Sequence, residues 1–268
     1  MTYEFLAVDS PAPGVRRITL NRPDQRNAIN NRMRAELFDA LETADTDAGV
    51  HVAIVRGAGD CFSAGYDLKR TGEPRPYHTA GGDGMWSRHV TDGWFRIWDL
   101  AKPVIAQVHG YAMAGGTELV AACDLVYVAH DASFSYPVAR VISPPDFQYH
   151  PWLAGMRNAM ELVLTGDPIT GDDAVRMGLA NRAFPAAELD EHVLTIAQRI
   201  AGVPAELLQI NKRSVHRAME IMGIRTALRE GSELQGLATH LPSTRALLAG
   251  GNPIASVKDA ASDSEPSL

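Results

Sequence analysis

Residues 109–118 combine glycines with one carboxylate in a pattern that could bind a developing negative charge. They read HGYAMAGGTE and lie between the apolar run 103–108, which predicts a buried strand, and residues 119–123, which predict a helix. A glycine-rich turn between a strand and a helix start directs free backbone N–H groups, and the positive end of the helix dipole, toward a ligand. Glu118 places a carboxylate within one helical turn of this spot.

The residue types of this stretch are compatible with three interpretations. A phosphate-binding loop would require a lysine where the chain has Gly116. In a purely structural interpretation, the glycines let the helix pack close to the sheet and Glu118 is a solvated charge. In a catalytic interpretation, Gly115 and Gly116 let a substrate approach the peptide backbone, because glycine has no Cβ atom.

Two further stretches favour the catalytic interpretation. Residues 57–69 read GAGDCFSAGYDLK and directly follow the β-branched run 51–56, and residues 21–28 read NRPDQRNA. Together with PVIAQVHGYAMAGGTEL over residues 103–119, they resemble the crotonase family, also called the enoyl-CoA hydratase/isomerase family, in order and spacing. The resemblance covers residues 4–250.

The resemblance implies an α/β fold, a crotonase-like spiral of ββα units with a helical C-terminal region. The hydrophobic patterns agree with it. We expect strands over residues 15–20, 51–56, 103–108 and 124–129, the last followed by a turn and a helix. We expect helices over residues 32–46 and 85–100, a short helix between Thr170 and Gly178, and amphipathic helices over residues 187–201, 205–222 and 224–240.

The pattern changes after residue 186. We expect a ββα-spiral core with the acyl-CoA site over residues 1–186 and a helical C-terminal oligomerisation region over residues 187–250. Residues 251–268 are rich in Ser, Ala, Asp and Pro, which predicts a disordered tail, and residues 71–84 predict a loop. Because the corresponding helices of crotonases pack against neighbouring subunits, the resemblance implies a homotrimer or a dimer of trimers.

The resemblance also assigns an oxyanion hole. A thioester oxygen gains negative charge when an enolate-like intermediate forms, and two convergent N–H donors stabilise that charge. The donors would be the N–H groups of Tyr66 and Gly115. Coenzyme A, as part of the substrate, would bind largely through main-chain contacts at Arg26, Ala28, Ala64, Gly65, Tyr66, Asp67 and Leu68.

Acid–base chemistry would fall to Glu118, which matches a carboxylate that hydratases use in proton transfer. Their second glutamate is replaced here by Val138, which cannot hold a proton. Asp146, in the proline-flanked segment SPPDFQ, is the second candidate, because some crotonases carry a catalytic aspartate at about this place. A surface turn is the alternative for Asp146. The sequence leaves open whether the pocket is also lined by Tyr136, Tyr149 and His150.

Composition limits the other partners and ligands. The formal net charge of −7, without a basic run, argues against nucleic acid as a partner. The cysteines Cys61 and Cys123 and the scattered histidines show no metal-ligand spacing, so we expect no metal site. The chain has neither a signal-peptide pattern nor a stretch of membrane-spanning length, so we expect a cytoplasmic protein without a membrane partner.

We therefore expect an enoyl-CoA hydratase-like lyase or isomerase that acts on an acyl-CoA thioester and needs no permanently bound cofactor. The alternatives on the same fold are a CoA-thioester hydrolase, a decarboxylase and a dehalogenase. A non-catalytic acyl-CoA-binding or scaffold protein is the alternative from another class, because Val138 removes one catalytic group.

Overall fold

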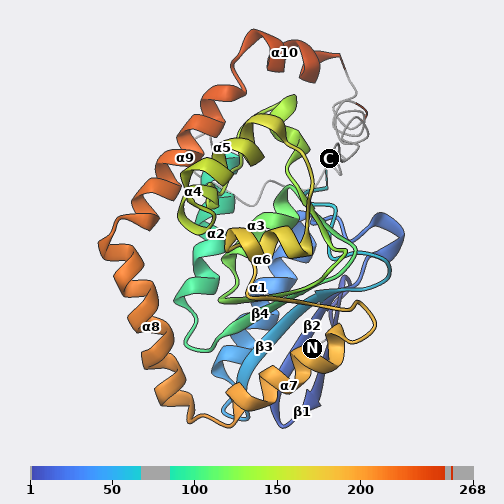
Figure 1. The fold of residues 1–268 in the computed structure, drawn as a ribbon, viewed down its shortest axis with the longest axis vertical. Coiled ribbons are helices and arrows are strands. Elements are labelled where there is room, and N and C mark those ends of the chain that lie inside the picture. The colour runs from blue at the N-terminus through green and yellow to red at the C-terminus, as the bar shows by residue number, and fades with distance from the viewer. Residues whose placement is uncertain (1, 68–84, 251–254, 256–268) are drawn as a thin grey trace.

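A six-stranded sheet in the order β1-β2-β3-β4-β6-β9 forms the frame of the molecule (Figure 1). The computed structural model describes residues 2–67, 85–250 and 255. β1 is antiparallel to β2, and the other neighbouring strands are parallel. The strands are β1 (Leu6–Ala12), β2 (Gly14–Leu20), β3 (Val50–Gly57), β4 (Val104–Val108), β6 (Leu125–Ala129) and β9 (Arg182–Phe184).

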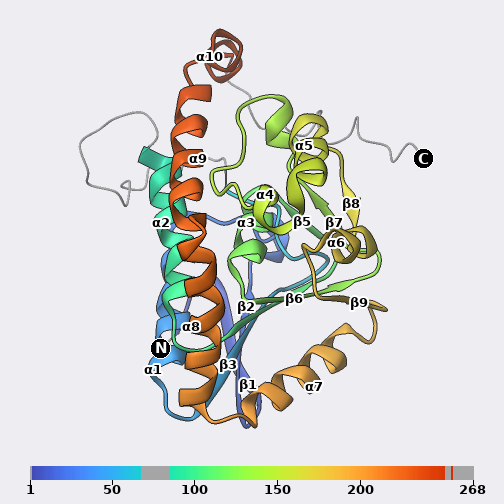
Figure 2. The ribbon, with the colours of Figure 1, turned by 60° about the vertical axis from the view of Figure 1, so that its left-hand side comes forward.

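The central strands are covered on both faces, which explains their continuous apolar runs. Every residue of β4 is buried, and α1 (Asn31–Thr46) and α7 (Leu189–Ala201) lie on opposite sides of the sheet (Figure 2). Asn30 caps α1, because its side chain accepts a hydrogen bond of 2.8 Å from the Met33 N–H. The expected strands are confirmed as β2, β3, β4 and β6, whereas β1 was not expected.

A second, three-stranded sheet supports the glycine-rich turn. β5 (Tyr111–Met113) runs parallel to β7 (Ser133–Ser135), which is antiparallel to β8 (Ile169–Thr170). β5 lies where the sequence predicted only a turn, and α3 (Gly115–Ala122) begins after it. The helix expected after the strand at 124–129 is wrong, because the chain instead forms β7, whose backbone groups pair with β5 and β8.

Short helices lie between strands, and α6 (Gly171–Met177) connects β8 of the second sheet to β9 of the first. In α6, Thr170 and Asp173 form a capping box, and Gly178 ends the helix with a φ of +91°, which confirms the predicted short helix. The other connecting helices were not predicted. They are the 3₁₀ helices η1 (Pro23–Gln25) and η2 (Pro137–Arg140) and the α-helices α4 (His150–Leu153) and α5 (Gly155–Thr165).

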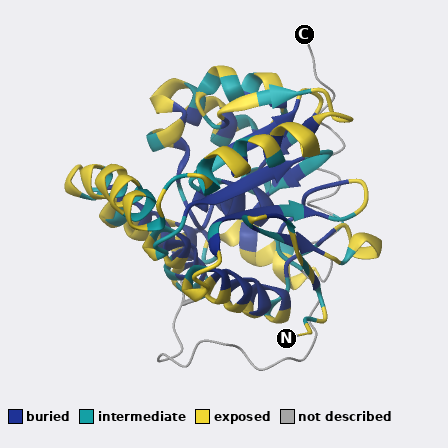
Figure 3. Ribbon diagram, turned by 90° about the horizontal axis from the view of Figure 1, so that it is seen from below, coloured by how far each residue is buried: buried dark blue, intermediate teal, exposed yellow. Residues whose placement is uncertain are grey.

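The C-terminal region is helical, as predicted, and after α7 its helices α8 (Ala205–Ile221) and α9 (Ile224–Ala238) extend along α2 (Met85–Asp99) on one side of the core (Figures 1 and 2). α9 packs against α2, whereas α8 contains no buried residue. Figure 3 shows burial concentrated in the sheets and exposure on many helical residues. The loop expected at 71–84 and the tail expected at 251–268 lie outside the described residues, apart from Ala255. A further short helix that was not predicted, α10 (Pro242–Ala249), follows α9.

A shielded ion pair attaches α8 to the end of α2. Lys212 Nζ lies 2.8 Å from the Asp124 carboxylate and donates to the carbonyl oxygens of Ile97 (2.9 Å) and Lys102 (3.0 Å). The other oxygen of Asp124 lies 2.7 Å from His216 Nε2. These contacts hold the C-terminal end of α2, and this helix contributes side chains to the site described below.

Candidate active site

Three loops at the carboxyl ends of the parallel strands β2, β3 and β4 are joined by backbone hydrogen bonds. The Ile29 N–H donates to the Gly65 carbonyl at 2.7 Å, and the Asp67 N–H donates to the Ile29 carbonyl at 2.9 Å. The Met113 N–H donates to the Ser63 carbonyl at 3.0 Å. Carboxyl ends of parallel strands are a common place for ligand sites, and here they bring the three sequence motifs together.

Gly65 allows the second and third of these loops to touch. Its φ is +90°, and a Cβ atom on it would lie 2.6 Å from the Met113 carbonyl oxygen and 3.0 Å from the Gly115 nitrogen. Ala114, which precedes α3, also has a positive φ, +45°, although left-handed backbone costs an L-residue about 1–2 kcal/mol. The surrounding contacts therefore hold this backbone in a conformation that it would not adopt alone.

The N–H groups of Tyr66 and Gly115 have no hydrogen-bond acceptor among the described residues. Tyr66 forms a parallel bridge with Ile29, in which the residues before and after Tyr66 make the hydrogen bonds, so its own N–H points away from Ile29. Gly115 is the first residue of α3, where an N–H has no partner within the helix. Both groups can therefore donate to a ligand, and their role as oxyanion donors stays a prediction.

Glu118 is fully buried in the first turn of α3, with 0% of the residue exposed. Its Oε2 accepts hydrogen bonds from the Tyr66 hydroxyl (2.5 Å) and Trp94 Nε1 (3.4 Å), and its Oε1 accepts one from the Phe147 N–H (3.2 Å). Burial and the Asp146 carboxylate raise the pKa of Glu118 above the ordinary value of a glutamate. A carboxyl group of this kind can take up and release a proton near neutral pH.

Asp146 lies in the same buried region, with 4% of the residue exposed. Its Oδ1 accepts a hydrogen bond from the Ser87 hydroxyl (2.8 Å), and its carbonyl oxygen accepts one from the Thr91 hydroxyl (3.0 Å). Burial raises the pKa of this carboxyl group as well. Since a negative charge on either carboxylate disfavours ionisation of the other, Glu118 and Asp146 titrate as a pair. A surface turn, the alternative for Asp146, is wrong.

One face of α2 contributes the polar partners of this carboxyl pair. Ser87, Thr91 and Trp94 are fully buried and are spaced at i, i+4 and i+7, which places them on the same side of the helix. None of them was a predicted site residue. The helical periodicity predicted over residues 85–100 already places these three side chains on one face of the helix. The sequence could not show that this face points toward the site.

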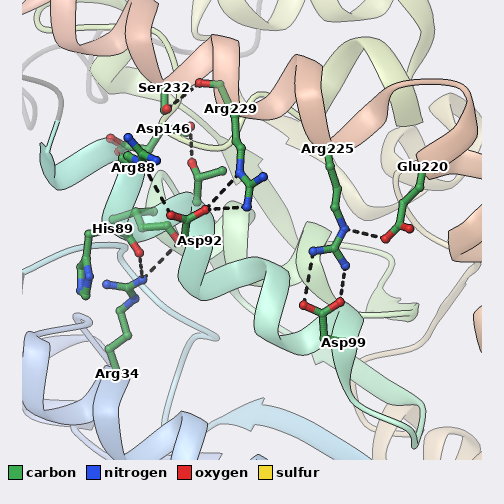
Figure 4. Close-up of polar contacts among 12 residues, drawn as sticks. Arg34, Arg88, His89, Asp92, Asp99, Asp146, Glu220, Arg225, Arg229 and Ser232 are labelled. Atoms are coloured by element: carbon green, nitrogen blue, oxygen red, sulfur yellow. Dashed lines mark hydrogen bonds and ion pairs between the residues drawn. The ribbon is translucent and has the colours of Figure 1, made fainter.

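Arg34 is a buried cation beside the carboxyl pair. Its side chain extends from α1 to α2, where Nη2 donates to the carbonyl oxygens of His89 (2.7 Å) and Val90 (3.1 Å) (Figure 4). Gly93 leaves room for this contact, because a Cβ atom there would lie 2.0 Å from Nη2. Burial lowers the pKa of Arg34, but a guanidinium stays protonated in proteins, so its charge favours the ionised forms of both carboxyl groups.

Arginines of α9 hold the outer side of α2 (Figure 4). Arg229 lies 3.2 Å from the Asp92 carboxylate, and Arg225 pairs with both Asp99 and Glu220. The Arg225 guanidinium also lies over the ring of Phe95, 4.8 Å from its centroid. α2 is thus fixed between Arg34 on its inner side and α9 on its outer side.

The residues expected to contact coenzyme A lie in the first two loops. Arg26 is exposed, and its carbonyl accepts a hydrogen bond of 2.9 Å from the Ala64 N–H. Asp67 forms an ion pair of 3.1 Å with Arg22, and the two side chains are only 7% and 8% exposed. The Asp67 carboxylate therefore links the first loop to the second, and Arg22 was not a predicted site residue. Leu68 lies outside the described residues.

The segment between β7 and α4 contributes aromatic side chains. Tyr136, Tyr149 and His150 are buried and line a cavity next to Thr117 of α3. Burial lowers the pKa of His150 to about 4, so its ring is neutral at pH 7. Val138 lies in η2 and brings no charge to this region. All three aromatic residues line a cavity beside α3, and their place in the substrate pocket stays a prediction.

The part of the chain that the structure describes contains no group of three or more His, Cys, Asp or Glu side chains that could hold a metal ion. Cys61 and Cys123 are buried and free. No helix among the described residues is long and apolar enough to span a membrane.

Comparison with known proteins finds similar chains. The sequence model of the enoyl-CoA hydratase/isomerase family matches residues 11–244. The chain is 33% identical over 221 residues to the mitochondrial enoyl-CoA hydratase of Pongo abelii, covering 81% of this chain and 72% of that protein. The crystal structure of an enoyl-CoA hydratase/isomerase from Xanthobacter autotrophicus Py2 superposes with a TM-score of 0.87 at 33% identity and covers 99% of this chain and 100% of that one. These similarities confirm the predicted fold.

We predict that Gly65→Ala destabilises the protein more than Gly223→Ala. Both glycines have a positive φ, +90° and +98°, so both substitutions strain the backbone. A Cβ atom at position 65 would collide with the Met113 carbonyl oxygen, whereas nothing lies within 4 Å of one at position 223. We expect the collision to lower the free energy of unfolding by an additional amount of about 1–3 kcal/mol, the range for overpacking. Urea unfolding measures the difference, and equal stabilities would contradict the close approach of the loops.

We predict that Glu118→Gln becomes more stabilising, relative to the parent, as the pH rises. The folded state raises the pKa of Glu118, so the unfolded chain releases this proton first and the parent loses stability between the two pKa values. Glutamine has no proton to lose. Thermal unfolding between pH 5 and pH 9 measures the trend, with Glu191→Gln, at an exposed position of α7, as the control. A stability difference that is independent of pH would show that Glu118 ionises as easily in the folded protein as in the unfolded chain.

Proposed function

The chain belongs to the enoyl-CoA hydratase/isomerase family, and we propose that it acts on an acyl-CoA thioester through an oxyanion hole formed by the N–H groups of Tyr66 and Gly115. The observation that carries the proposal is the buried carboxyl pair, Glu118 and Asp146, next to two N–H groups that have no acceptor among the residues that the structure describes. The formation of an enolate requires hydrogen-bond donors for the thioester oxygen and a group that takes up the α proton, both in one buried region.

In the proposed mechanism, the thioester oxygen accepts hydrogen bonds from both N–H groups. Removal of a proton from the α carbon moves negative charge onto this oxygen, and each donor stabilises the resulting enolate by about 3 kcal/mol. Glu118 takes the proton from one carbon and returns it to another. Its raised pKa supports this role, because Glu118 can then both accept and release a proton near neutral pH.

Val138 limits the hydration reaction in this proposal. Adding water across an α,β double bond needs a base for the water and an acid for the α carbon, and paired carboxylates share these roles. Glu118 alone can move one proton between carbons, which is isomerase chemistry. Asp146 offers a second carboxyl group, eight positions after Val138 in the same connection between β7 and α4. We therefore propose proton transfer on the acyl group as the main chemistry, with weak hydration of linear enoyl-CoAs.

We predict that Glu118→Gln lowers kcat by about 10²- to 10⁴-fold on the acyl-CoA that the protein turns over, because an amide cannot exchange the proton. Asp146→Asn should also lower kcat, and Glu191→Gln, at an exposed position of α7, should not. The measurement is turnover of a panel of enoyl- and dienoyl-CoA esters, with the products separated by chromatography. Tight acyl-CoA binding without any product would favour the scaffold alternative, and release of free CoA would favour a hydrolase.

The same assay tests the role of Val138. Val138→Glu restores a carboxylate and should raise the hydration of crotonyl-CoA, whereas Val138→Gln, which adds a side chain of similar size without an acid, should not. Robust hydration by the parent protein that is insensitive to both Glu118→Gln and Asp146→Asn would contradict this placement of the acid–base chemistry.

We further propose a homotrimer or a dimer of trimers, assembled through the helices after residue 187. α8 supports this, because its outward side carries apolar side chains with no cover in a single chain. Exposed apolar surface on this scale is typical of an interface. The side chains are Leu207 (46% exposed), Ile210 (64%), Val215 (65%) and Ile221 (80%).

We predict a mass of three or six chains by light scattering, constant over a wide concentration range. Ile210→Glu should reduce this mass, because a charge would be buried in the interface. Ile210→Leu, which keeps an apolar side chain at the same position, is the control and should leave the mass unchanged. A parent protein that is a monomer at every concentration would contradict the proposal.

A further inference from the structure

The Tyr66 side chain connects the two free N–H groups to Glu118. Its hydroxyl donates a hydrogen bond of 2.5 Å to Glu118 Oε2. Its ring lies against Gly115, because a Cβ atom on this glycine would be 2.6 Å from Tyr66 Cε2 and Cζ. Trp86 packs edge-on against the same ring, with 5.3 Å between the centroids. The phenol is thus held between the N-terminus of α3 and the buried carboxyl group.

The direction of the hydrogen bonds follows from the chemistry of the groups. Trp94 Nε1 lies 3.0 Å from the Tyr66 hydroxyl oxygen, and an indole N–H can only donate. The hydroxyl oxygen therefore accepts from Trp94, and its single proton is directed at Glu118. Glu118 Oε2 then accepts from two donors, Tyr66 and Trp94, whereas Oε1 accepts only from the Phe147 N–H at 3.2 Å. A proton carried by Glu118 therefore resides on Oε1, which keeps a lone pair for the Phe147 N–H.

Glu118 has charged or titratable neighbours on each element packed around it. Among them, Arg34 favours ionised Glu118 and Asp146 disfavours it, whereas burial raises the pKa of both Tyr136 and Tyr149 and keeps them neutral. Of the titratable side chains that the structure describes, Tyr66 is the one with a hydrogen bond to the carboxyl group of Glu118. The Tyr66 hydroxyl is therefore placed to control this group directly.

We propose that the Tyr66 hydroxyl is a positioning residue for Glu118, which holds Oε2 as an acceptor and leaves Oε1 as the oxygen that exchanges a proton with the substrate. The inference rests on the proposed function, in which Glu118 moves that proton. A phenol suits a site with Val138 in place of a second carboxylate, because it donates a hydrogen bond without adding negative charge. Since the backbone of Tyr66 would also hold the thioester oxygen, one residue links substrate binding to the orientation of Glu118.

Tyr66→Phe tests this proposal, because it removes the hydroxyl and keeps the ring and the backbone N–H. A hydrogen bond to a charged group corresponds to about a 10- to 100-fold change in rate, so we expect kcat to fall by that factor while KM changes little. The pH profile of kcat should move to higher pH, because ionised Glu118 loses a donor. Tyr127→Phe, in the middle of β6, is the matched control and should change neither kcat nor its pH profile.

A second measurement does not depend on turnover. Carbon-13 NMR of labelled glutamate carboxyl groups gives the pKa of Glu118, with Glu118→Gln to assign its signal. We expect the pKa of Glu118 to rise in Tyr66→Phe and to stay unchanged in Tyr127→Phe. An unchanged pKa in Tyr66→Phe would overturn the proposal.

The two measurements separate this inference from the proposed function. If the parent turns over an acyl-CoA and Tyr66→Phe alters neither its pH profile nor the pKa of Glu118, the inference fails and the proposed function stands. If the pKa rises in Tyr66→Phe but the parent turns over no CoA ester, the proposed function fails and the control of Glu118 by Tyr66 stands.

Discussion

The close contact between the loop after β3 and the loop after β4 is the constraint on which the site depends. Gly65 has no side chain, so the Met113 carbonyl and the Gly115 nitrogen can approach its Cα. This approach sets the backbone of Tyr66 beside the first turn of α3, where N–H groups lack helical partners. The free donors, the phenol of Tyr66 and the carboxyl group of Glu118 are all positioned by this single contact.

Burying two carboxyl groups side by side is unfavourable unless they keep protons or gain partners. The structure uses both solutions. Burial raises the pKa of Glu118 and of Asp146, which retains protons, and hydrogen bonds from Tyr66, Trp94 and Ser87 satisfy the oxygens. The buried guanidinium of Arg34 partly compensates the remaining negative charge. A pair balanced in this way changes its protonation with little change in free energy, and this property is useful for moving protons.

α2 provides the wall that closes this region, and its position is determined from both sides. On the inner side, Arg34 reaches its backbone carbonyls through the space left by Gly93. On the outer side, Lys212 of α8 and the arginines of α9 hold it, so the C-terminal helices contribute to the site without touching it. Ser87 and Trp94 are therefore held in position to donate hydrogen bonds to the carboxyl pair.

The sequence alone determined the family, the main parallel strands, the short helix that begins after Thr170 and the order of the three motifs. These features depend on local periodicity, on capping residues and on glycine patterns, and each of these can be recognised in a short stretch of sequence. It also identified Glu118 and Asp146 as the carboxyl groups of interest. Only the tertiary structure decided that Tyr66 donates to Glu118, that Asp67 pairs with Arg22, and that Arg34 lies beside the carboxyl pair. These contacts join residues about 45 to 110 positions apart, and side-chain direction across such distances is set by packing and burial, which no local pattern encodes.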